Sequence, residues 1–70
     1  MKCYIETRLP ATGKKHYGCV VSEQDYHERG PHSYSHKTAE FKTRAEAAAA
    51  AREWADEHGY SIYSVDEIAV

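Results

Sequence analysis

An alanine-rich segment in the second half of the chain predicts a helix. Six alanines lie between residues 45 and 51, and alanine has the highest helix propensity of all residues. Thr43 and Glu46 have the spacing of a capping box, in which the threonine hydroxyl accepts from the Glu46 amide and the carboxylate reaches back to the amide of Thr43. The carboxylate also suits the positive end of the helix dipole. With Gly59 just after the last turn, the pattern predicts a helix over residues 44–58.

At 100° per residue, this helix has one apolar face and one acidic face. The apolar face is nearly all alanine with one large side chain, and its members are Ala47, Ala48, Ala51, Trp54, Ala55 and His58. The opposite side carries Glu46, Glu53, Asp56 and Glu57. A face of small residues lets a helix lie close to a sheet, whose larger side chains then fill the space. We therefore expect the helix to pack across a β-sheet.

Three segments before the helix and one after it have the pattern of β-strands. Within residues 2–9, one side carries Cys3, Ile5, Thr7 and Leu9, and the other carries Lys2, Tyr4, Glu6 and Arg8. The other expected strands are residues 16–23, 34–41 and 60–65, with a turn over residues 10–13 and a loop over residues 24–33. The sequence thus predicts a single α+β domain over residues 1–70 in the order β-β-β-α-β, with one helix across a small antiparallel sheet. Nothing in the chain is expected to cover the other face, which antiparallel sheets tolerate.

Large aliphatic side chains are scarce in this chain. Val, Ile, Leu and Phe together number nine of 70 residues, whereas there are ten alanines, six tyrosines and one tryptophan. Because the net charge is only −2, the composition does not indicate disorder. We expect a thin core rich in aromatic residues, or a core completed by a partner, with a dimer left open.

No apolar run approaches the roughly 20 residues of a transmembrane helix, so no membrane association is expected. The N-terminal residues do not have the pattern of a targeting segment. Two cysteines are too few for a disulfide scaffold. We therefore expect a cytoplasmic protein in which Cys3 and Cys19 are buried free thiols.

Candidate metal and catalytic residues form no recognised motif. Three histidines lie within ten residues, with a cysteine on the preceding strand: His27, His32, His36 and Cys19. Their spacing differs from the paired short spacing of structural zinc sites. Asp25, His27 and Glu28 could serve acid–base chemistry, but so short a chain can hardly enclose a dry pocket that would tune their pKa values. We expect no metal, no cofactor and no enzymatic activity.

Charge is divided along the sequence. Residues 1–44 carry eight Lys and Arg against five acidic residues, a balance of +3, whereas residues 45–70 carry Arg52 against six acidic residues, a balance of −5. The expected sheet and its loops are therefore basic, and the helix and C-terminal segment are acidic. Such asymmetry indicates charged partners.

The segment AEFKTRAEA, residues 39–47, resembles the end of the sheet and the start of the helix in the arm-type DNA-binding domains of phage integrases, which are similar to the AP2 domain. The matching residues are Phe41, Thr43, Arg44, Glu46 and Ala47. This resemblance implies a three-stranded sheet packed on one helix and a DNA partner. In size, acidity, alanine-rich helix and order of elements, the whole chain is also similar to small phage anti-defence proteins, including anti-CRISPR inhibitors. That similarity implies a non-enzymatic protein that acts in a host cell. Its acidic surface would mimic DNA and occupy a site on a host complex that normally holds nucleic acid.

Two functions are therefore predicted. The first is an inhibitor or adaptor of phage or mobile-element type, which binds the basic surface of a host complex that handles nucleic acid. Its acidic face would comprise Glu46, Glu53, Asp56, Glu57, Asp66 and Glu67, with an aromatic anchor such as Tyr26, Tyr60 or Tyr63. The alternative is a nucleic-acid-binding module that uses the basic sheet, with Tyr4, Tyr34 and Tyr17 as candidates for stacking. Because Leu and Ile are scarce, we expect most of these tyrosines to build the core instead. The phosphate-binding residues of this module would be Arg8, Lys14, Lys15, Lys37 and Lys42.

Overall fold

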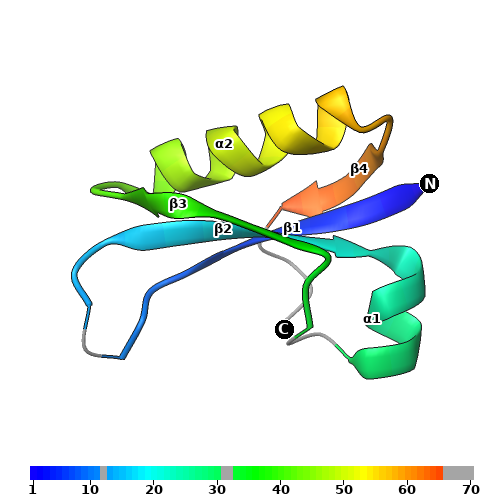
Figure 1. Cartoon of the computed structure of the whole chain (residues 1–70), viewed down its shortest axis with the longest axis horizontal. Helices are drawn as coiled ribbons and strands as arrows, with labels where there is room; N and C mark the ends of the chain where they lie inside the picture. Colours follow the sequence, from blue (N-terminus) through cyan, green and yellow to red (C-terminus); the bar gives the residue numbers. More distant parts are fainter. Residues whose placement is uncertain (12, 31–32, 66–70) are drawn as a thin grey trace.

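A computed structural model describes residues 1–11, 13–30 and 33–65 of the chain (Figure 1). The strands are β1 (Lys2–Arg8), β2 (His16–Ser22), β3 (His36–Phe41) and β4 (Ser61–Val65), and the helices are α1 (Glu23–Arg29) and α2 (Arg44–Glu57). The four strands form one sheet in the order β3-β2-β1-β4. α2 crosses one face of this sheet, and α1 lies on the opposite side, directly after β2 (Figure 1). The predicted α+β class is confirmed.

The sheet is mixed, so the prediction of a purely antiparallel sheet is wrong. β1 pairs antiparallel with β2, with Ile5 opposite Val20, and β2 pairs antiparallel with β3. β4 pairs parallel with β1, with Cys3 opposite Ile62. α2 carries the chain back along the sheet after β3, and the next strand then starts at the end where β1 starts (Figure 1). The crossing helix α2 therefore makes β4 parallel to β3. Because β3 is antiparallel to β2 and β2 is antiparallel to β1, β4 is also parallel to β1.

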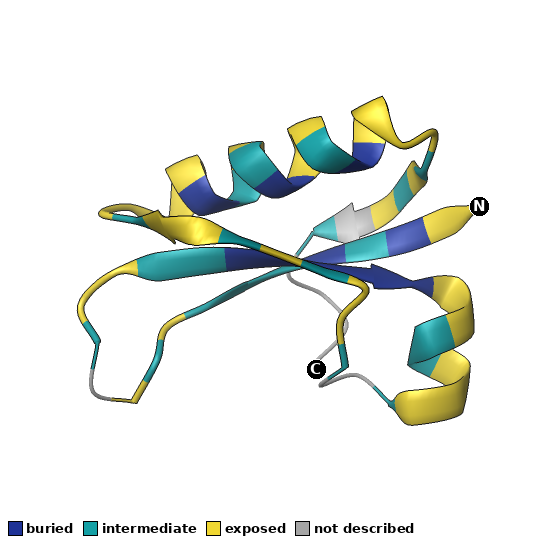
Figure 2. Ribbon diagram, in the orientation of Figure 1, coloured by how far each residue is buried: buried dark blue, intermediate teal, exposed yellow. Residues whose placement is uncertain are grey.

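The hydrophobic core lies between the sheet and α2. Its fully buried members come from β1, β2 and α2, and they are Cys3, Ile5, Val20, Ala51 and Ala55. Four partly buried side chains pack against them: Trp54, Tyr60, Ile62 and Val65. Figure 2 shows buried positions where α2 faces the sheet and along the central strands. The core is thin, as predicted, but the prediction of a core rich in aromatic residues is wrong: within the described residues its fully buried members are aliphatic side chains and a cysteine, and the aromatic side chains Trp54 and Tyr60 are only partly buried.

α2 lies close to β2 because the residues at their contact are small. A Cβ atom added at Gly18 would lie 2.5 Å from the carbonyl oxygen of Ala47 and 2.9 Å from the Cβ of Ala51. Real side chains do not tolerate such distances, so only the hydrogen of glycine fits there. The alanine face thus lets the helix approach the sheet closely, as predicted.

The N-terminus of α2 is capped by Thr43, as the sequence predicts. Its Oγ1 accepts from the amide of Glu46 at 3.2 Å and donates to the Glu46 carboxylate at 2.9 Å. The carboxylate therefore meets the hydroxyl of Thr43, whereas a capping box directs it to the amide of that residue.

The C-terminus of α2 is closed by His58 as the cap and by Gly59, which has a φ of 74°. The amide of Gly59 donates to the carbonyl oxygen of Asp56, and the amide of Tyr60 donates to that of Ala55. These two hydrogen bonds form a Schellman motif, which confirms the predicted role of the glycine. Neither helix of the described residues is long and apolar enough to cross a membrane.

The prediction of a loop over residues 24–33 is wrong, because most of that segment forms α1. Ser22 caps this helix, since its Oγ accepts from the amide of Asp25 at 3.1 Å. Glu23 and Asp25 lie in the first turn, where carboxylates suit the helix dipole, and Gly30 ends the helix with a φ of 90°. The Ser-x-x-Asp spacing could have indicated a helix start, but α1 buries no residue and has no apolar period to detect. The order of elements is therefore β-β-α-β-α-β.

Cys3 and Cys19 are both buried and free, as predicted. They lie on opposite faces of the sheet. Cys3 and Ile5 belong to the core under α2, so Glu6, the next residue of β1, points to the other face. Cys19 pairs with Glu6 and therefore also points to that other face. Burial raises the pKa of both thiols.

Candidate nucleic-acid interface

Five of the six tyrosines gather on the sheet face opposite α2. Alternation along β1 directs Tyr4 away from the core residues Cys3 and Ile5. The five residues, named the tyrosine face below, are Tyr4, Tyr17, Tyr26, Tyr34 and Tyr63. The sixth, Tyr60, packs edge-on against Trp54 on the α2 side, with the ring centroids 5.6 Å apart. The tyrosines therefore do not only build the main core.

Tyr4 lies at the centre of a three-ring cluster on this face. Its ring centroid is 5.0 Å from that of Tyr26 on α1 and 5.3 Å from that of Tyr63 on β4. These are contact distances for tilted aromatic pairs. Partial burial raises the pKa of Tyr4, and the nearby carboxylate of Glu23 raises it further. Because Tyr26 packs α1 onto the sheet, the prediction that nothing covers this face is wrong at this point.

Three tyrosines of the face each have a cation next to the ring. The pairs are Lys37 with Tyr17 at 4.5 Å, Lys2 with Tyr63 at 5.7 Å, and Arg8 with Tyr34 at 5.9 Å, from the cationic group to the ring centroid. All three distances lie within the roughly 6 Å range of cation–π interactions. The face therefore presents aromatic rings and positive charges side by side.

Arg8 is a predicted phosphate-binding residue, but its guanidinium group is engaged within the protein. It donates to the carboxylate of Glu6 at 3.1 Å and to the carbonyl oxygen of Ser33 at 3.2 Å. Only 17% of the Arg8 side chain is exposed. Burial has the largest effect on the pKa of Arg8 and lowers it, but the hydrogen bond to Glu6 and the nearby side chains of Cys19, Glu6 and Tyr17 together outweigh burial and hold the pKa above its usual value. Arg8 thus connects β1 to the segment that carries Tyr34.

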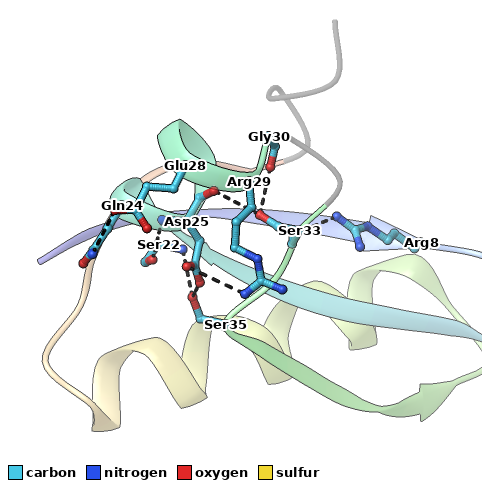
Figure 3. Close-up of polar contacts among 9 residues, drawn as sticks. All are labelled: Arg8, Ser22, Gln24, Asp25, Glu28, Arg29, Gly30, Ser33 and Ser35. Carbon is cyan, nitrogen blue, oxygen red and sulfur yellow. Dashed lines mark hydrogen bonds and ion pairs between the residues drawn. The ribbon is translucent and has the colours of Figure 1, made fainter.

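The segment that leads into β3 is anchored on both sides of Tyr34 (Figure 3). The hydroxyl of Ser33 donates to the carbonyl oxygen of Gly30 at 2.8 Å, and the hydroxyl of Ser35 donates to the carboxylate of Asp25 at 2.5 Å. Because both neighbours are held, the backbone of Tyr34 is already in place before any ligand binds. Its side chain is 46% exposed.

Three of the other four predicted phosphate-binding residues lie at the loop end of the β1–β2 hairpin or next to it, and the fourth, Lys37, lies within β3 opposite Cys19. His16 pairs with Phe41, so Lys15, which precedes β2, and Lys42, which follows β3, leave the sheet at the same end. Lys14 lies beside Lys15 in the connection from β1. These three residues, named the hairpin lysines below, are all exposed. The sheet thus brings together lysines that are far apart in the sequence.

The predicted acidic face lies on the other layer of the molecule. Glu46, Glu53, Asp56 and Glu57 are all exposed on α2. The predicted anchors Tyr26 and Tyr63 lie across the sheet, on the tyrosine face. One flat surface cannot include both sets, so the acidic residues and these anchors do not form one site. Asp66 and Glu67 lie outside the described residues.

The residues considered as metal ligands do not converge. His27 is exposed on α1, His36 stacks on Trp54 on the α2 side, and Cys19 is buried on the other face. His32 lies outside the described residues. Within the part of the chain that the structure describes, no three His, Cys, Asp or Glu residues are placed to hold a metal ion.

The three residues considered for acid–base chemistry all lie on α1. His27 and Glu28 are exposed. Asp25 accepts from the hydroxyl of Ser35 and lies 4.0 Å from the guanidinium of Arg29. Asp25 therefore has a structural role that the sequence did not indicate, since it holds α1 to the segment before β3 (Figure 3).

A stack of three rings on the α2 side was also missed from the sequence. Trp54 lies between His36, at 4.3 Å between centroids, and His58, at 3.9 Å, with nearly parallel planes. The Nδ1 atom of His58 lies 2.8 Å from the carbonyl oxygen of Trp54. Burial lowers the pKa of His36, and the neighbouring His58 lowers it further. The i, i+4 spacing of Trp54 and His58 is visible in the sequence, but the approach of His36 from β3 is not.

No protein-family model matches the chain, and the comparisons with curated proteins and with solved structures also found no match. The similarities to integrase arm-type domains and to anti-CRISPR inhibitors therefore stay predictions. The support for a function comes from the arrangement of side chains on the two faces.

Proposed function

We propose that this protein is a small non-enzymatic binding protein that binds nucleic acid through the tyrosine face and the hairpin lysines. The observation that carries the proposal is that five tyrosines, three of them next to a cation, share one sheet face beside three exposed lysines. Nucleic acids offer flat bases, which stack on aromatic rings, and phosphates, which bind lysine and arginine.

The side chains of the interface divide into two roles. Lys14, Lys15 and Lys42, which are exposed at the sheet end, bind phosphates as point charges. Lys37 is also exposed and lies over the ring of Tyr17, where it can contact a phosphate next to a stacked base. Arg8 holds the segment of Tyr34 and is a positioning residue in this proposal, not a phosphate ligand.

Fluorescence anisotropy with labelled DNA and RNA oligonucleotides tests the proposal. Reversing Lys14, Lys15 and Lys37 to Glu should remove binding, while the melting temperature stays close to that of the wild type because these side chains are exposed. The logarithm of the affinity should fall linearly with the logarithm of the salt concentration, with a slope of about 0.7 to 0.9 per phosphate contact.

The matched control reverses Glu53 and Glu57, which are exposed on α2, on the other side of the sheet. Glu53→Lys with Glu57→Lys should leave the affinity for nucleic acid unchanged or increase it, because the overall charge becomes more positive. Binding that survives the lysine reversals and falls with the glutamate reversals would contradict the proposal.

The exposed carboxylates of α2 support a second proposal, which is that this layer binds the basic surface of a protein. Three alanines of the helix are buried against the sheet, whereas Glu46, Glu53, Asp56 and Glu57 all face solvent. Such charges mainly accelerate and orient association. A protein complex that persists after nuclease treatment, is lost in Glu53→Lys with Glu57→Lys, and is unaffected by the lysine reversals would favour this second function over the first.

A further inference from the structure

We infer that the nucleic acid bound at the tyrosine face is single-stranded, with bases stacked on Tyr34 and Tyr63. This inference rests on the proposed function and specifies its ligand. It follows from the shape of the face, from the exposure of these two rings and from the position of the cations beside them.

The shape of the face disfavours a duplex. α1 stands on the same side of the sheet as the tyrosines and packs onto it through Tyr26 and Tyr4 (Figure 1). A major groove is about 12 Å wide and admits one helix or a two-stranded ribbon. Four strands at a spacing of about 4.8 Å already span about 14 Å between the outer strand axes. A sheet of this width with a helix projecting from it cannot lie flat in the groove, whereas a flexible single strand can pass beside α1.

Two rings of the face are open to a base. Tyr63 is 66% exposed and Tyr34 is 46% exposed, whereas Tyr4, Tyr17 and Tyr26 are half-buried. Stacking needs a free ring face, which single strands can reach because their bases are unpaired. Tyr4 contacts Tyr63, with 5.3 Å between the ring centroids. Tyr34 is held by its anchored neighbours, so little conformational freedom remains to be lost on binding.

The two open rings lie on opposite sides of β1. Tyr63 belongs to β4, which pairs with β1 on one side. Tyr34 directly precedes Ser35, whose amide donates to the carbonyl oxygen of Val20 on β2, and β2 pairs with β1 on the other side. A single strand that stacks on both rings would therefore cross the sheet from the β4 side towards Tyr34.

The charges fit a strand that follows this path. The ammonium of Lys2 lies 5.7 Å from the ring centroid of Tyr63, so a phosphate next to a base stacked there is within its reach. Lys37, on β3, and the hairpin lysines, at the far end of β3, continue the positive charge from Tyr34. Rings and cations thus alternate, as expected for binding that does not depend on base sequence.

The experiment compares a 12-nucleotide oligothymidine, a 12-nucleotide oligouridine and a 12-base-pair duplex by fluorescence anisotropy at one salt concentration. Single strands should bind at least about ten-fold more tightly than the duplex. Tyr63→Ala and Tyr34→Ala should each weaken single-strand binding by about five-fold to a hundred-fold. Tyr63→Phe and Tyr34→Phe are the matched controls, since they keep the ring and should bind like the wild type. Melting curves of all four variants check that the fold is retained.

Each outcome separates the inference from the function on which it rests. If the duplex binds as tightly as the single strands, or if the alanine variants bind like the phenylalanine variants, while the lysine reversals still remove binding, then nucleic-acid binding stands and the single-strand inference is wrong. If no oligonucleotide binds at physiological salt, the proposed function itself is wrong. Single-strand binding that requires both rings and the lysines supports both.

Discussion

Gly18→Ala tests the close contact between α2 and β2, on which the whole layer arrangement depends. The added methyl group would lie 2.5 Å from the carbonyl oxygen of Ala47 and 2.9 Å from the Cβ of Ala51. A side chain could rotate away from such a contact, but the oxygen belongs to the helix backbone and cannot. Gly18 has no positive φ, so the backbone itself would accept alanine and the cost would be steric.

The expected loss of stability is large for a chain of this size. Overpacking of a core costs about 1–3 kcal/mol, and we expect about 3 kcal/mol here because the whole helix has to shift. A 70-residue domain has a free energy of unfolding of about 4–10 kcal/mol, so roughly a third or more would be lost. The melting temperature should fall by about 12–24 °C, at about 4–8 °C per kcal/mol. Thermal and urea unfolding followed by far-UV circular dichroism measure both quantities.

Two comparisons isolate the steric cause. Gly30 and Gly59 have open space around an added Cβ but positive φ angles, so alanine there should cost only about 1 kcal/mol, through backbone strain. The double variant Gly18→Ala with Ala51→Gly removes one of the two contacts but leaves the carbonyl oxygen of Ala47, so it should remain destabilised. A Gly18→Ala protein that melts together with the wild type would refute the close packing of α2 on β2.

Three further changes test the capping, core and titration of the protein. Thr43→Ala removes the hydroxyl that accepts from the Glu46 amide and should lower the free energy of unfolding by about 1 kcal/mol in urea titrations; an unchanged value would argue against the cap. Trp54→Ala removes the ring that packs against the core and between two histidines, and should cost about 3 kcal/mol; a variant as stable and cooperative as the wild type would show that Trp54 is not the anchor of α2. The pKa of His36 is lowered from about 6.5 in the folded protein by burial and by His58, so the unfolded chain binds the proton more readily. The contribution of neutral His36 to the free energy of unfolding is present in full above about pH 6.5, and it is lost as the pH falls through the lower pKa of the folded protein. His36→Gln should therefore flatten the dependence of the free energy of unfolding, measured in urea, on pH between about 7.5 and 5. An equal slope in both proteins would exclude His36 as its source.

Interactions between neighbours in the chain could be derived from the residues alone. Thr43 and Glu46 mark the start of α2 and Gly59 marks its end, because capping depends on backbone groups three or four positions away. Alternation placed Tyr4 and Arg8 on the side of β1 that faces away from Cys3 and Ile5, since successive side chains of any strand point to opposite faces. The candidate lysines were also identified from the sequence, although their common position was not.

Other features depended on which strands pair and on which side a helix lies. β4 runs parallel to β1 because α2 returns the chain along the whole sheet, and no residue in β4 encodes that direction. Asp25 was assigned to a loop, but its short helix is stabilised by a cap and by Ser35 from a later segment.

The same distinction between local interactions and contacts between distant segments applies to the candidate site. Periodicity and charge counts identified basic strands, tyrosines and an acidic helix, because these are properties of short segments. The meeting of Tyr63 with Tyr4, of Arg8 with Ser33, and of the hairpin lysines at one sheet end required the strand order β3-β2-β1-β4. Contacts between distant segments depend on the free energy of the whole packed chain, which local propensities do not contain. For that reason the two opposite surfaces, one of tyrosines and cations and one of carboxylates, could be assigned only once the layers were in place.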